Sequence, residues 1–495
     1  MSRIPFALLA LSLLLLGSGA AQAQRLPSST KPVVDAELVQ RLGDDFIRAD
    51  QAEALSIALV QQGQVRYFNF GTVVPGGQQP PTEHSVYEVG SVSKVFTSLL
   101  LAHAVVNQRM ALDDDIRRHL PGRYPNLQFK GRPVTVRELA NTTSALPDNL
   151  PDFESIVVGV KPSDRPAALA AALARYSDED LLRDLNAVTL LGRPGTTPRH
   201  SNLASKLLGL MLERVYGAPY PALLQRHVEQ PLGMQSGVGE ARATLMVTGQ
   251  DPQHLPMPAT NQPAILPAGG LRYSTADLAR FVAAELRPAT PAMRLSQQAL
   301  WGKPDALAVG FNWNISRNTE SDLRLQASGG TFGSASHVEI YPARGYGIVL
   351  LANRSGDAQW LLQQLADQVF EAAVSTPALG ALQAALQARG FVDVDKVVSQ
   401  VRRTHPELHL TEAYVNQWGG SLLAAKQWDA ALGLFKFNAR RWPKSTNAHD
   451  SLGYAYLQLG DKVRAAAAYR RAVRLDPANA DAAQSLQALS LRPTQ

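Results

Sequence analysis

The sequence contains no cysteine. This absence excludes disulfide bonds, cysteine-based zinc sites, iron–sulfur clusters and a cysteine nucleophile. It also excludes a bacterial lipoprotein anchor, because such an anchor is attached to a cysteine that follows the export signal.

Basic residues are present but dispersed. The chain has 48 Lys and Arg against 42 Asp and Glu, a formal net charge of +6, and its pI is near 9.4. No dense run of Lys or Arg accompanies this excess, so we expect no nucleic-acid partner.

Three motifs that identify common enzyme classes are also missing. The histidines form no H-E-x-x-H pattern, and we predict neither a metal nor another cofactor. The chain has no G-x-x-x-x-G-K-[ST] phosphate-binding loop. It lacks G-x-S-x-G as well, which argues against the α/β-hydrolase design.

The composition that remains is typical of a globular protein. The chain has 495 residues, of which 45% are apolar and 18% are charged. At about 150 residues per domain, this length predicts roughly three structural units.

Residues 1–23 are predicted to form an export signal. Arg3 supplies the positive charge, residues 4–16 are apolar, and Ala21-Gln22-Ala23 is a cleavage site near Ala23. The apolar stretch is short for a bilayer span and no later stretch qualifies, so we expect no transmembrane span in the mature chain. The protein is therefore predicted to be periplasmic or secreted. An uncleaved N-terminal anchor is the alternative.

Residues 33–375 are predicted to form the first domain. Strand-prone runs at 55–60 and 64–70 form one hairpin, and runs at 338–341 and 347–351 form another. Helical patterns lie between the two hairpins, and an amphipathic helix follows the second. This order predicts an α+β fold in which both ends of the domain build one antiparallel sheet flanked by helices.

Residues 411–490 contain an internal repeat. Equivalent positions are separated by 34 residues, and the pairs are Gly419 and Gly453, Ala431 and Ala465, Phe435 and Tyr469, and Pro443 and Pro477. They resemble the tetratricopeptide helix–turn–helix pattern, and such a region predicts a protein partner. Two repeats alone bury too little to be stable. We therefore expect them to pack on a helical linker at 376–410 or on the first domain.

Ser91-Val92-Ser93-Lys94 is an S-x-x-K element at the start of a helical run. The spacing places Lys94 one turn after Ser91 on the same face, and a buried lysine with a lowered pKa can take a proton from a serine. The motif alone is weak, because Ser28-Ser29-Thr30-Lys31 fits it equally well. The alternative is that Ser91 only caps a helix.

Five segments, in the same order along the chain, resemble class C β-lactamases and related penicillin-recognising serine hydrolases. They are VYEVGSVSKVFTSLLLAHAVVNQRMALDDDIRRHLPG, VTVRELANTTSALP, PGTTPRHSNLASKLLGLMLERVYGAPY, PAGGLRYSTADLARF and QASGGTFGSASHVEIYPARGYGIVLLANRS. The second segment has Ala145 where the family has glycine. The resemblance covers roughly residues 45–375. It implies a β-lactamase/transpeptidase-like sheet with a helical lobe, and some family members also carry C-terminal tetratricopeptide repeats.

The resemblance implies a role for each matched residue. Ser91 would be the acylated nucleophile, Lys94 would assist its proton transfer, and Asn202 would orient the lysine and the acyl side chain of the substrate. The family has tyrosine where this chain has His200. A histidine titrates near neutral pH, so it could accept the serine proton and return it to the leaving group. The alternative is that this substitution has weakened or abolished catalysis.

The third family motif corresponds to Ala327 and the residues after it. Ser328 and Gly329 would contact the substrate, and the backbone N–H groups of Ser91 and Gly330 would form the oxyanion hole. The family usually has lysine or histidine where this chain has Ala327, and that cation favours substrates with a carboxylate. Its absence makes esters and neutral amides better candidates, unless Arg324 or His337 approaches the site.

The sequence thus predicts an exported serine hydrolase that cleaves an ester or amide through an acyl-enzyme. The substrate would be a small molecule or peptide of the carboxylesterase, β-lactam or D-amino-acid peptide type. The alternative is a degenerate penicillin-binding-like module that binds a cell-wall fragment or peptide, with the repeats recruiting a protein partner.

Overall fold

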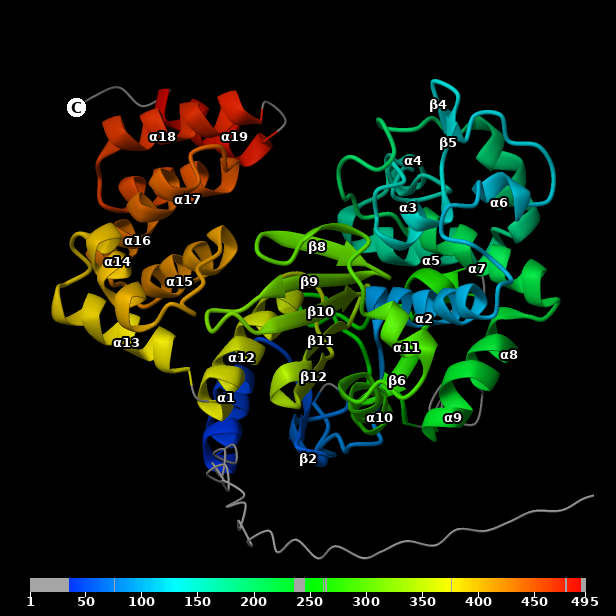
Figure 1. Ribbon diagram of the computed structural model, residues 1–495, viewed down its shortest axis with the longest axis horizontal. Helices are drawn as coiled ribbons and strands as arrows, with labels where there is room; N and C mark the ends of the chain where they lie inside the picture. Colours follow the sequence, from blue (N-terminus) through cyan, green and yellow to red (C-terminus); the bar gives the residue numbers. More distant parts are fainter. Residues whose placement is uncertain are drawn as a thin grey trace, which may run out of the picture.

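The computed structural model describes residues 35–490, apart from residues 75, 236–244, 261, 263–264, 375 and 477–478. The predicted export signal, its cleavage site and the first two residues of the predicted hydrolase domain lie outside the described residues, as does the second S-x-x-K element. The described chain forms a large α+β part with an all-helical C-terminal part beside it (Figure 1).

One large antiparallel sheet organises the α+β part of the described chain. Its strands are β1 (Ala54–Gln61), β2 (Gln64–Gly71), β7 (Trp301–Lys303), β8 (Leu307–Gly310), β9 (Trp313–Arg317), β10 (Leu323–Gly330), β11 (Ala335–Tyr341) and β12 (Tyr346–Ala352). Their order is β2-β1-β12-β11-β10-β9-β8-β7. Both predicted hairpins are present, and Leu55 pairs with Ala352 across them. The predicted α+β fold with one sheet built from both ends of the domain is confirmed.

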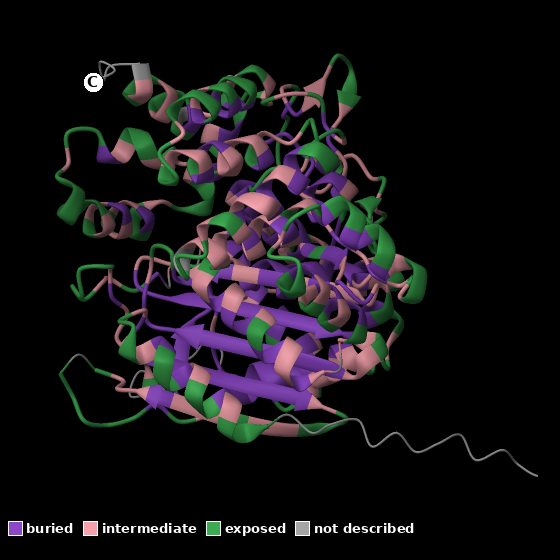
Figure 2. Ribbon diagram, turned by 90° about the vertical axis from the view of Figure 1, so that its left-hand side faces the viewer, coloured by how far each residue is buried: buried purple, intermediate pink, exposed green. Residues whose placement is uncertain are grey.

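Strand β1 shows why helices cover the sheet on both faces. Leu55, Ile57 and Leu59 pack in an apolar cluster with α1 (Ala36–Arg48) and α12 (Ala358–Ala373). Its alternate residues, including Ala58 and Val60, join the core on the opposite face, where α10 (Thr275–Leu286) packs. A strand with apolar residues at successive positions can only be buried on both sides. Figure 2 shows the central strands buried in this way.

A helical lobe is inserted between the two ends of the sheet. Its elements are η1 (Gly90–Val92), α2 (Ser93–Val106), η2 (Ile116–Arg118), α3 (Val136–Ala140), α4 (Phe153–Val157), η3 (Pro162–Asp164), α5 (Arg165–Arg175), α6 (Asp178–Asp184), η4 (Leu185–Ala187), α7 (Asn202–Tyr216), α8 (Tyr220–Leu224), η5 (Gln225–Glu229), α9 (Gln230–Leu232), η8 (Leu266–Gly270) and α11 (Pro291–Ser296). Two small ribbons accompany them, β3 (Val86–Glu88) with β6 (Arg272–Ser274), and β4 (Gln128–Phe129) with β5 (Arg132–Pro133).

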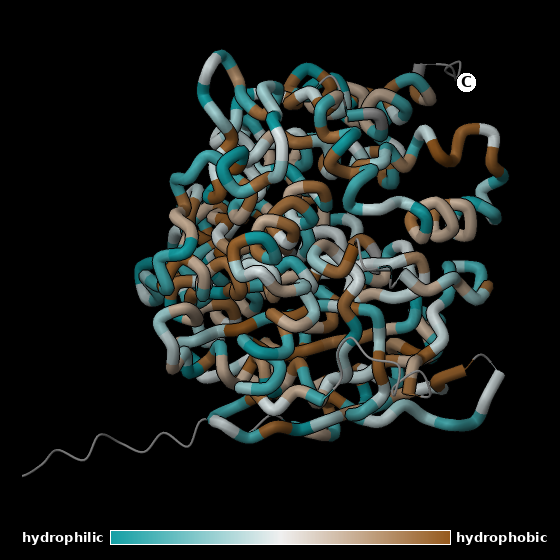
Figure 3. The backbone as a smooth tube through the Cα atoms, turned by 90° about the vertical axis from the view of Figure 1, so that its right-hand side faces the viewer, coloured by the Kyte–Doolittle hydropathy of each residue, from teal (hydrophilic) through white to brown (hydrophobic). Residues whose placement is uncertain are grey.

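Helix α2 is the core helix of this lobe. Its sequence SKVFTSLLLAHAVV is apolar on nearly every side, and most of its residues are buried. Such a helix is stable only inside a core. Figure 3 shows hydrophobic segments gathered inside the molecule and hydrophilic ones at its outer turns. The N-terminus of α2 is thereby held at the junction of the lobe with β10, which contacts η1.

The C-terminal part consists of helical hairpins. Its helices are α13 (Pro377–Ala388), α14 (Val394–Thr404), α15 (Glu412–Ala424), α16 (Trp428–Arg441), α17 (Thr446–Gln458), α18 (Lys462–Leu475) and α19 (Ala480–Ser490). A Cβ atom on Gly419 would lie 2.6 Å from the ring of Phe435, and one on Gly453 would lie 2.9 Å from the ring of Tyr469. The aromatic ring of each repeat therefore packs against the glycine of the facing helix, and the two contacts are at positions separated by the predicted 34-residue offset. Pro477 lies outside the described residues.

The repeats are attached to both neighbours that could support them. Helices α13, α14, α15 and α16 share one apolar cluster. The Gln417 side chain donates to Asp367 Oδ2 of α12 at 2.8 Å, and the His409 N–H donates to the Thr319 carbonyl at 3.0 Å. None of the described helices is by itself long and apolar enough to span a membrane. Helices α12 and α13 together reach that length and composition, but the angle between them is 102°.

Candidate active site

Ser91 and Lys94 lie in the first turns of the buried core helix. Ser91 is in η1, which leads directly into α2, and Lys94 follows one turn later with 5% of its surface exposed. The Lys94 Nζ lies 2.7 Å from Ser91 Oγ. It also lies 2.7 Å from Asn202 Oδ1 and 2.7 Å from the Ala268 carbonyl oxygen. The structure therefore brings the predicted nucleophile, lysine and asparagine together.

Burial changes the acidity of Lys94. The pKa of this amine falls from 10.5 to about 7, mainly because of burial. The negative charge of Asp148 opposes this fall, and the positive charge of Lys206 adds to it. A large fraction of Lys94 is consequently neutral near pH 7, and a neutral amine can accept the hydroxyl proton of Ser91.

His200 contacts Ser91 from the other side. The His200 Nε2 lies 3.3 Å from Ser91 Oγ, and its Nδ1 lies 2.8 Å from Asp148 Oδ1. Burial works to raise the pKa of Asp148. The hydrogen bonds from His200 and the Asn202 N–H and the nearby charges of His200 and Lys94 together outweigh it, so the pKa lies below its usual value. An ionised Asp148 accepts a hydrogen bond from Nδ1–H, which keeps the proton on Nδ1 and leaves the Nε2 lone pair facing Ser91. This is the arrangement of a Ser-His-Asp triad.

The loop that carries Asp148 is held by the N-terminus of α7. The backbone N–H of Asn202 donates to Asp148 Oδ1 at 3.1 Å, and that of Leu203 donates to the Asp148 carbonyl at 2.9 Å. Ser201, the N-cap of α7, donates its hydroxyl to the Pro147 carbonyl at 2.7 Å. The free N–H groups of a helix N-terminus favour a carboxylate there, so this contact positions Asp148 as well as His200.

Glycines allow strand β10 to approach η1 closely. A Cβ atom on Gly329 would lie 2.0 Å from the Val89 carbonyl oxygen and 2.7 Å from the Ser91 nitrogen. Gly90 has φ of 50°, and its Cβ would lie 2.5 Å from the Gly330 nitrogen. Only residues without a Cβ fit here. The two N–H groups of the predicted oxyanion hole, those of Ser91 and Gly330, therefore belong to backbone segments in direct contact, and their role stays a prediction.

Ala327 and Ser328 point to opposite faces of β10. Ala327 is 5% exposed and belongs to the apolar core, so it contributes nothing to the site. Ser328 lines the cavity, and its Oγ shares a 2.7 Å hydrogen bond with Nδ1 of the buried His337. The His337 Nε2 contacts Glu339 at 2.7 Å, and Arg324 faces the same carboxylate at 3.6 Å. Neither His337 nor Arg324 is among the described residues that line the cavity.

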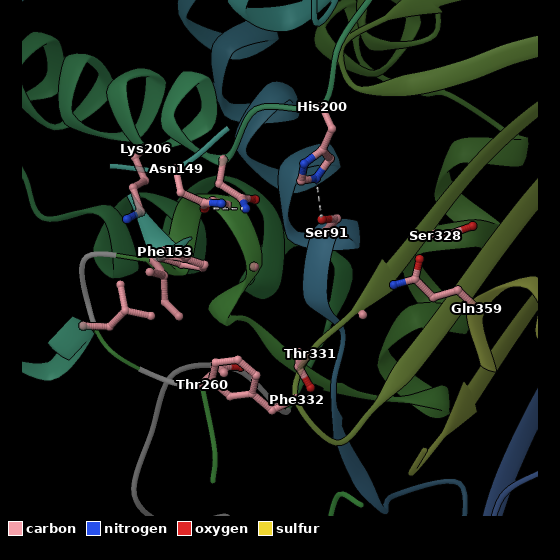
Figure 4. Close-up of a pocket in the computed structure, with 16 residues that line it drawn as sticks. Ser91, Asn149, Phe153, His200, Lys206, Thr260, Ser328, Thr331, Phe332 and Gln359 are labelled. Atoms are coloured by element: carbon pink, nitrogen blue, oxygen red, sulfur yellow. Dashed lines mark hydrogen bonds between the residues drawn. The ribbon is translucent and has the colours of Figure 1, made fainter. Parts of the chain in front are cut away.

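The site opens into a cavity of about 470 Å³ (Figure 4). Its lining residues are Ser91, Asn149, Phe153, Leu173, His200, Asn202, Lys206, Thr260, Ile265, Ala268, Gly269, Ser328, Gly330, Thr331, Phe332 and Gln359. The predicted Ser91, His200, Asn202, Ser328 and Gly330 are all among them.

Sequence reasoning missed several polar groups at or beside the cavity. Asp148 and Asn149 directly follow the segment VTVRELANTTSALP, and the Asn202 amide donates to Asn149 Oδ1 at 2.9 Å. Lys206 follows Asn202 by four residues, a helical spacing that places both on one face of α7. That spacing was a usable signal for Lys206. Ala145, at the position of the family's glycine, has φ of 58°, which is a conformation that favours glycine.

The β-lactamase family model matches residues 37–368 of the chain. The chain belongs to the β-lactamase family. A model of the tetratricopeptide repeat matches residues 446–479. The resemblance stated from the sequence segments is therefore confirmed for both parts.

Relatives and solved structures agree with this assignment. The chain is 24% identical to "Beta-lactamase" of Pseudomonas fluorescens, over 64% of this chain and 93% of the relative. It is also 24% identical to "D-alanyl-D-alanine-carboxypeptidase/endopeptidase AmpH" of Escherichia coli K12, over 66% and 86%. The fold is similar to a β-lactamase/D-alanine carboxypeptidase of Pseudomonas syringae (TM-score 0.57, 21% identity, 68% of this chain and 98% of that one). It is also similar to a class C β-lactamase of Rhodobacter sphaeroides (TM-score 0.56, 19% identity, 68% and 100%).

Proposed function

We propose that the protein is an exported serine hydrolase that cleaves an ester or amide through an acyl-enzyme on Ser91. The observation that supports this most directly is the position of Ser91 Oγ between two bases, 2.7 Å from Lys94 Nζ and 3.3 Å from His200 Nε2. A serine that only caps a helix needs neither base. The export signal predicted at residues 1–23 supports the periplasmic or secreted location.

Acylation uses both bases. Neutral Lys94 takes the hydroxyl proton as Ser91 Oγ bonds to the carbonyl carbon, and the carbonyl oxygen becomes an oxyanion against the N–H groups of Ser91 and Gly330. Neutral His200, held by Asp148, accepts this proton from the Lys94 ammonium. Its Nε2 then gives the proton to the leaving alcohol or amine as the carbonyl–leaving-group bond breaks, which returns both bases to their neutral forms. In deacylation, neutral His200 takes a proton from the water that attacks the acyl carbon. It returns this proton to Ser91 Oγ as the bond between Oγ and the acyl carbon breaks and the acid leaves.

The leaving-group side of the site favours neutral substrates. Ala327 is buried in the core, and the cavity side of β10 presents the uncharged Ser328. Recognition of a carboxylate beyond the scissile bond would need a cation there. We therefore favour a carboxylic ester or neutral amide over the substrates named for the β-lactamase and carboxypeptidase relatives.

Labelling of Ser91 tests the proposal. Intact-mass measurement after exposure to a fluorophosphonate should show one adduct on the wild type and none on Ser91→Ala. The exposed Ser155→Ala variant should label as the wild type does. Turnover of a p-nitrophenyl ester and of nitrocefin should be lost in Ser91→Ala. Equal turnover by both proteins, with no adduct on either, would favour the degenerate binding module instead.

We also propose that the C-terminal repeats bind a protein partner of the hydrolase. The match of residues 446–479 to a repeat whose stacked helices form binding surfaces supports this. Affinity capture by the full chain, compared with capture by a chain that ends after residue 443, should yield a protein bound only by the full chain.

A further inference from the structure

The cavity holds a second lysine that the acyl-transfer chemistry does not use. Lys206 is 3% exposed, yet its side chain lines the cavity from α7. Figure 4 shows it on the same side of Ser91 as Asn149 and Phe153, whereas Ser328 and Gln359 lie on the other side. Because Asn202 precedes it by one helical turn, Lys206 lies beyond the asparagine that contacts Lys94.

The Lys206 ammonium is only partly satisfied by the protein. Its Nζ donates to the Leu150 carbonyl at 3.2 Å, which uses one of its three N–H donors. Asp178 acts on it electrostatically, but within the described part of the chain no carboxylate forms an ion pair with it. Burial lowers the pKa of Lys206 to about 8, so at pH 7 most molecules carry a buried, underpaired positive charge. A buried charge of this kind is costly unless an anion compensates it.

The wall of the cavity that contains Ser91 and Lys206 is mainly apolar. Phe153, Leu173 and Ile265 contribute hydrophobic walls to the cavity. An acyl group that fills it would therefore carry methylenes along these walls and an anion at its far end. A neutral acyl chain of the same length would leave the ammonium without an anionic partner.

We propose that Lys206 is the binding group for a carboxylate at the end of the substrate's acyl chain, so that the preferred substrates are half-esters or half-amides of dicarboxylic acids or acyl groups with an acidic side chain. This inference rests on the proposed acyl transfer to Ser91. It places the substrate's negative charge on the acyl side, and the leaving-group side stays neutral, in agreement with Ala327.

Paired esters test the subsite in the wild-type protein. Mono-p-nitrophenyl esters of succinate, glutarate and adipate are compared with neutral p-nitrophenyl esters of equal chain length. At the best length, kcat/KM should be at least about 10-fold higher for the half-ester, the effect of one charge-assisted hydrogen bond. A ratio of one or less at every length would overturn the proposal.

Substitution of Lys206 identifies the group responsible. Lys206→Met has a similar volume without the charge, and it should reduce the half-ester to neutral-ester ratio of kcat/KM about 10- to 100-fold. Lys206→Arg should keep part of the ratio. The exposed Lys161→Met is the matched control and should keep all of it. Equal losses on both esters would overturn the proposal, because they would mean that Lys206 acts through the pKa of Lys94.

A binding measurement separates this proposal from the proposed function. Calorimetry on Ser91→Ala uses monomethyl glutarate, with methyl valerate as the neutral control. We expect binding of the half-ester, and its loss in Ser91→Ala/Lys206→Met. Half-ester binding by Ser91→Ala, together with no ester hydrolysis by the wild type, would retain the anion subsite and contradict the hydrolase. Ester hydrolysis by the wild type with no preference for half-esters, together with no half-ester binding by Ser91→Ala, would retain the hydrolase and overturn the subsite.

Discussion

Asp148 holds His200 from the side opposite Ser91, with 2.8 Å between Asp148 Oδ1 and His200 Nδ1. The carboxylate is itself held by the Asn202 N–H at the start of α7. A histidine in place of the family's tyrosine is thus accompanied by an acid that selects one tautomer of its ring. We infer that the pair acts as a unit, with Asp148 as the positioning residue.

This relationship predicts the effect of Asp148→Asn. An amide can present an N–H to Nδ1 and favour the wrong tautomer, so kcat for a p-nitrophenyl ester should fall about 100-fold. Fluorophosphonate labelling of Ser91 should slow in parallel. The control is Glu154→Gln, an exposed acid a few residues away, which should behave as the wild type. Unchanged kcat and an unchanged pH profile in Asp148→Asn would contradict the triad.

The lowered pKa of Lys94 predicts how turnover depends on pH. Below pH 7 the amine is mostly protonated and cannot accept the Ser91 proton, so kcat/KM should rise as pH increases through about 7 and then level off. Lys94→Arg stays protonated throughout and should lose nearly all turnover, while Lys130→Arg on an exposed turn should keep it. Initial rates between pH 5 and 9, corrected for spontaneous hydrolysis, give the test. A flat profile would show that Lys94 is not the base.

The glycine–aromatic contact in the second repeat predicts a local loss of stability. In Gly453→Val the added side chain overlaps the ring of Tyr469, which should cost about 1–3 kcal/mol and speed hydrogen exchange in α17 and α18. Gly420→Ala is the matched control, because a Cβ there meets nothing within 4 Å, and it should protect α15 slightly. Ester turnover should not change in either variant. Equal exchange rates in Gly453→Val and the wild type would refute the packing.

The contact between the two parts of the chain predicts the effect of Glu320→Ala. The buried Glu320 carboxylate accepts the backbone N–H groups of Ala378 and Leu379, at 3.3 and 2.9 Å, in the first turn of α13. Removing this cap should cost about 1 kcal/mol and increase proteolytic cleavage just before α13. Glu320→Gln keeps an acceptor and should recover part of the protection. The control is Asp305→Ala, at an exposed position, and this variant should be cleaved at the wild-type rate. Cleavage of Glu320→Ala at the wild-type rate would contradict a stabilising role for the cap.

Local patterns in the sequence determined much of the architecture. The strand-prone runs and the turns between them predicted both hairpins. The helical run that follows Ser91 predicted a helix start there, with Lys94 one turn later on the same face. The 34-residue offset predicted two equivalent helical hairpins, and the contacts of Gly419 with Phe435 and of Gly453 with Tyr469 are at equivalent positions in them. These features depend on contacts within one element or between neighbouring ones, and such contacts follow from residue periodicity.

Only the tertiary structure decided the composition of the site. His200 lies 109 residues from Ser91 and 52 from Asp148, and His337 reaches the cavity only through Ser328. Whether a lysine such as Lys206 faces solvent or a cavity depends on what packs over its helix, which one segment of sequence does not state. Hydrophobic periodicity specifies which face of an element is buried. The packing of distant loops and helices determines which polar side chains come into contact in the cavity, and the chemistry of the site depends on those contacts.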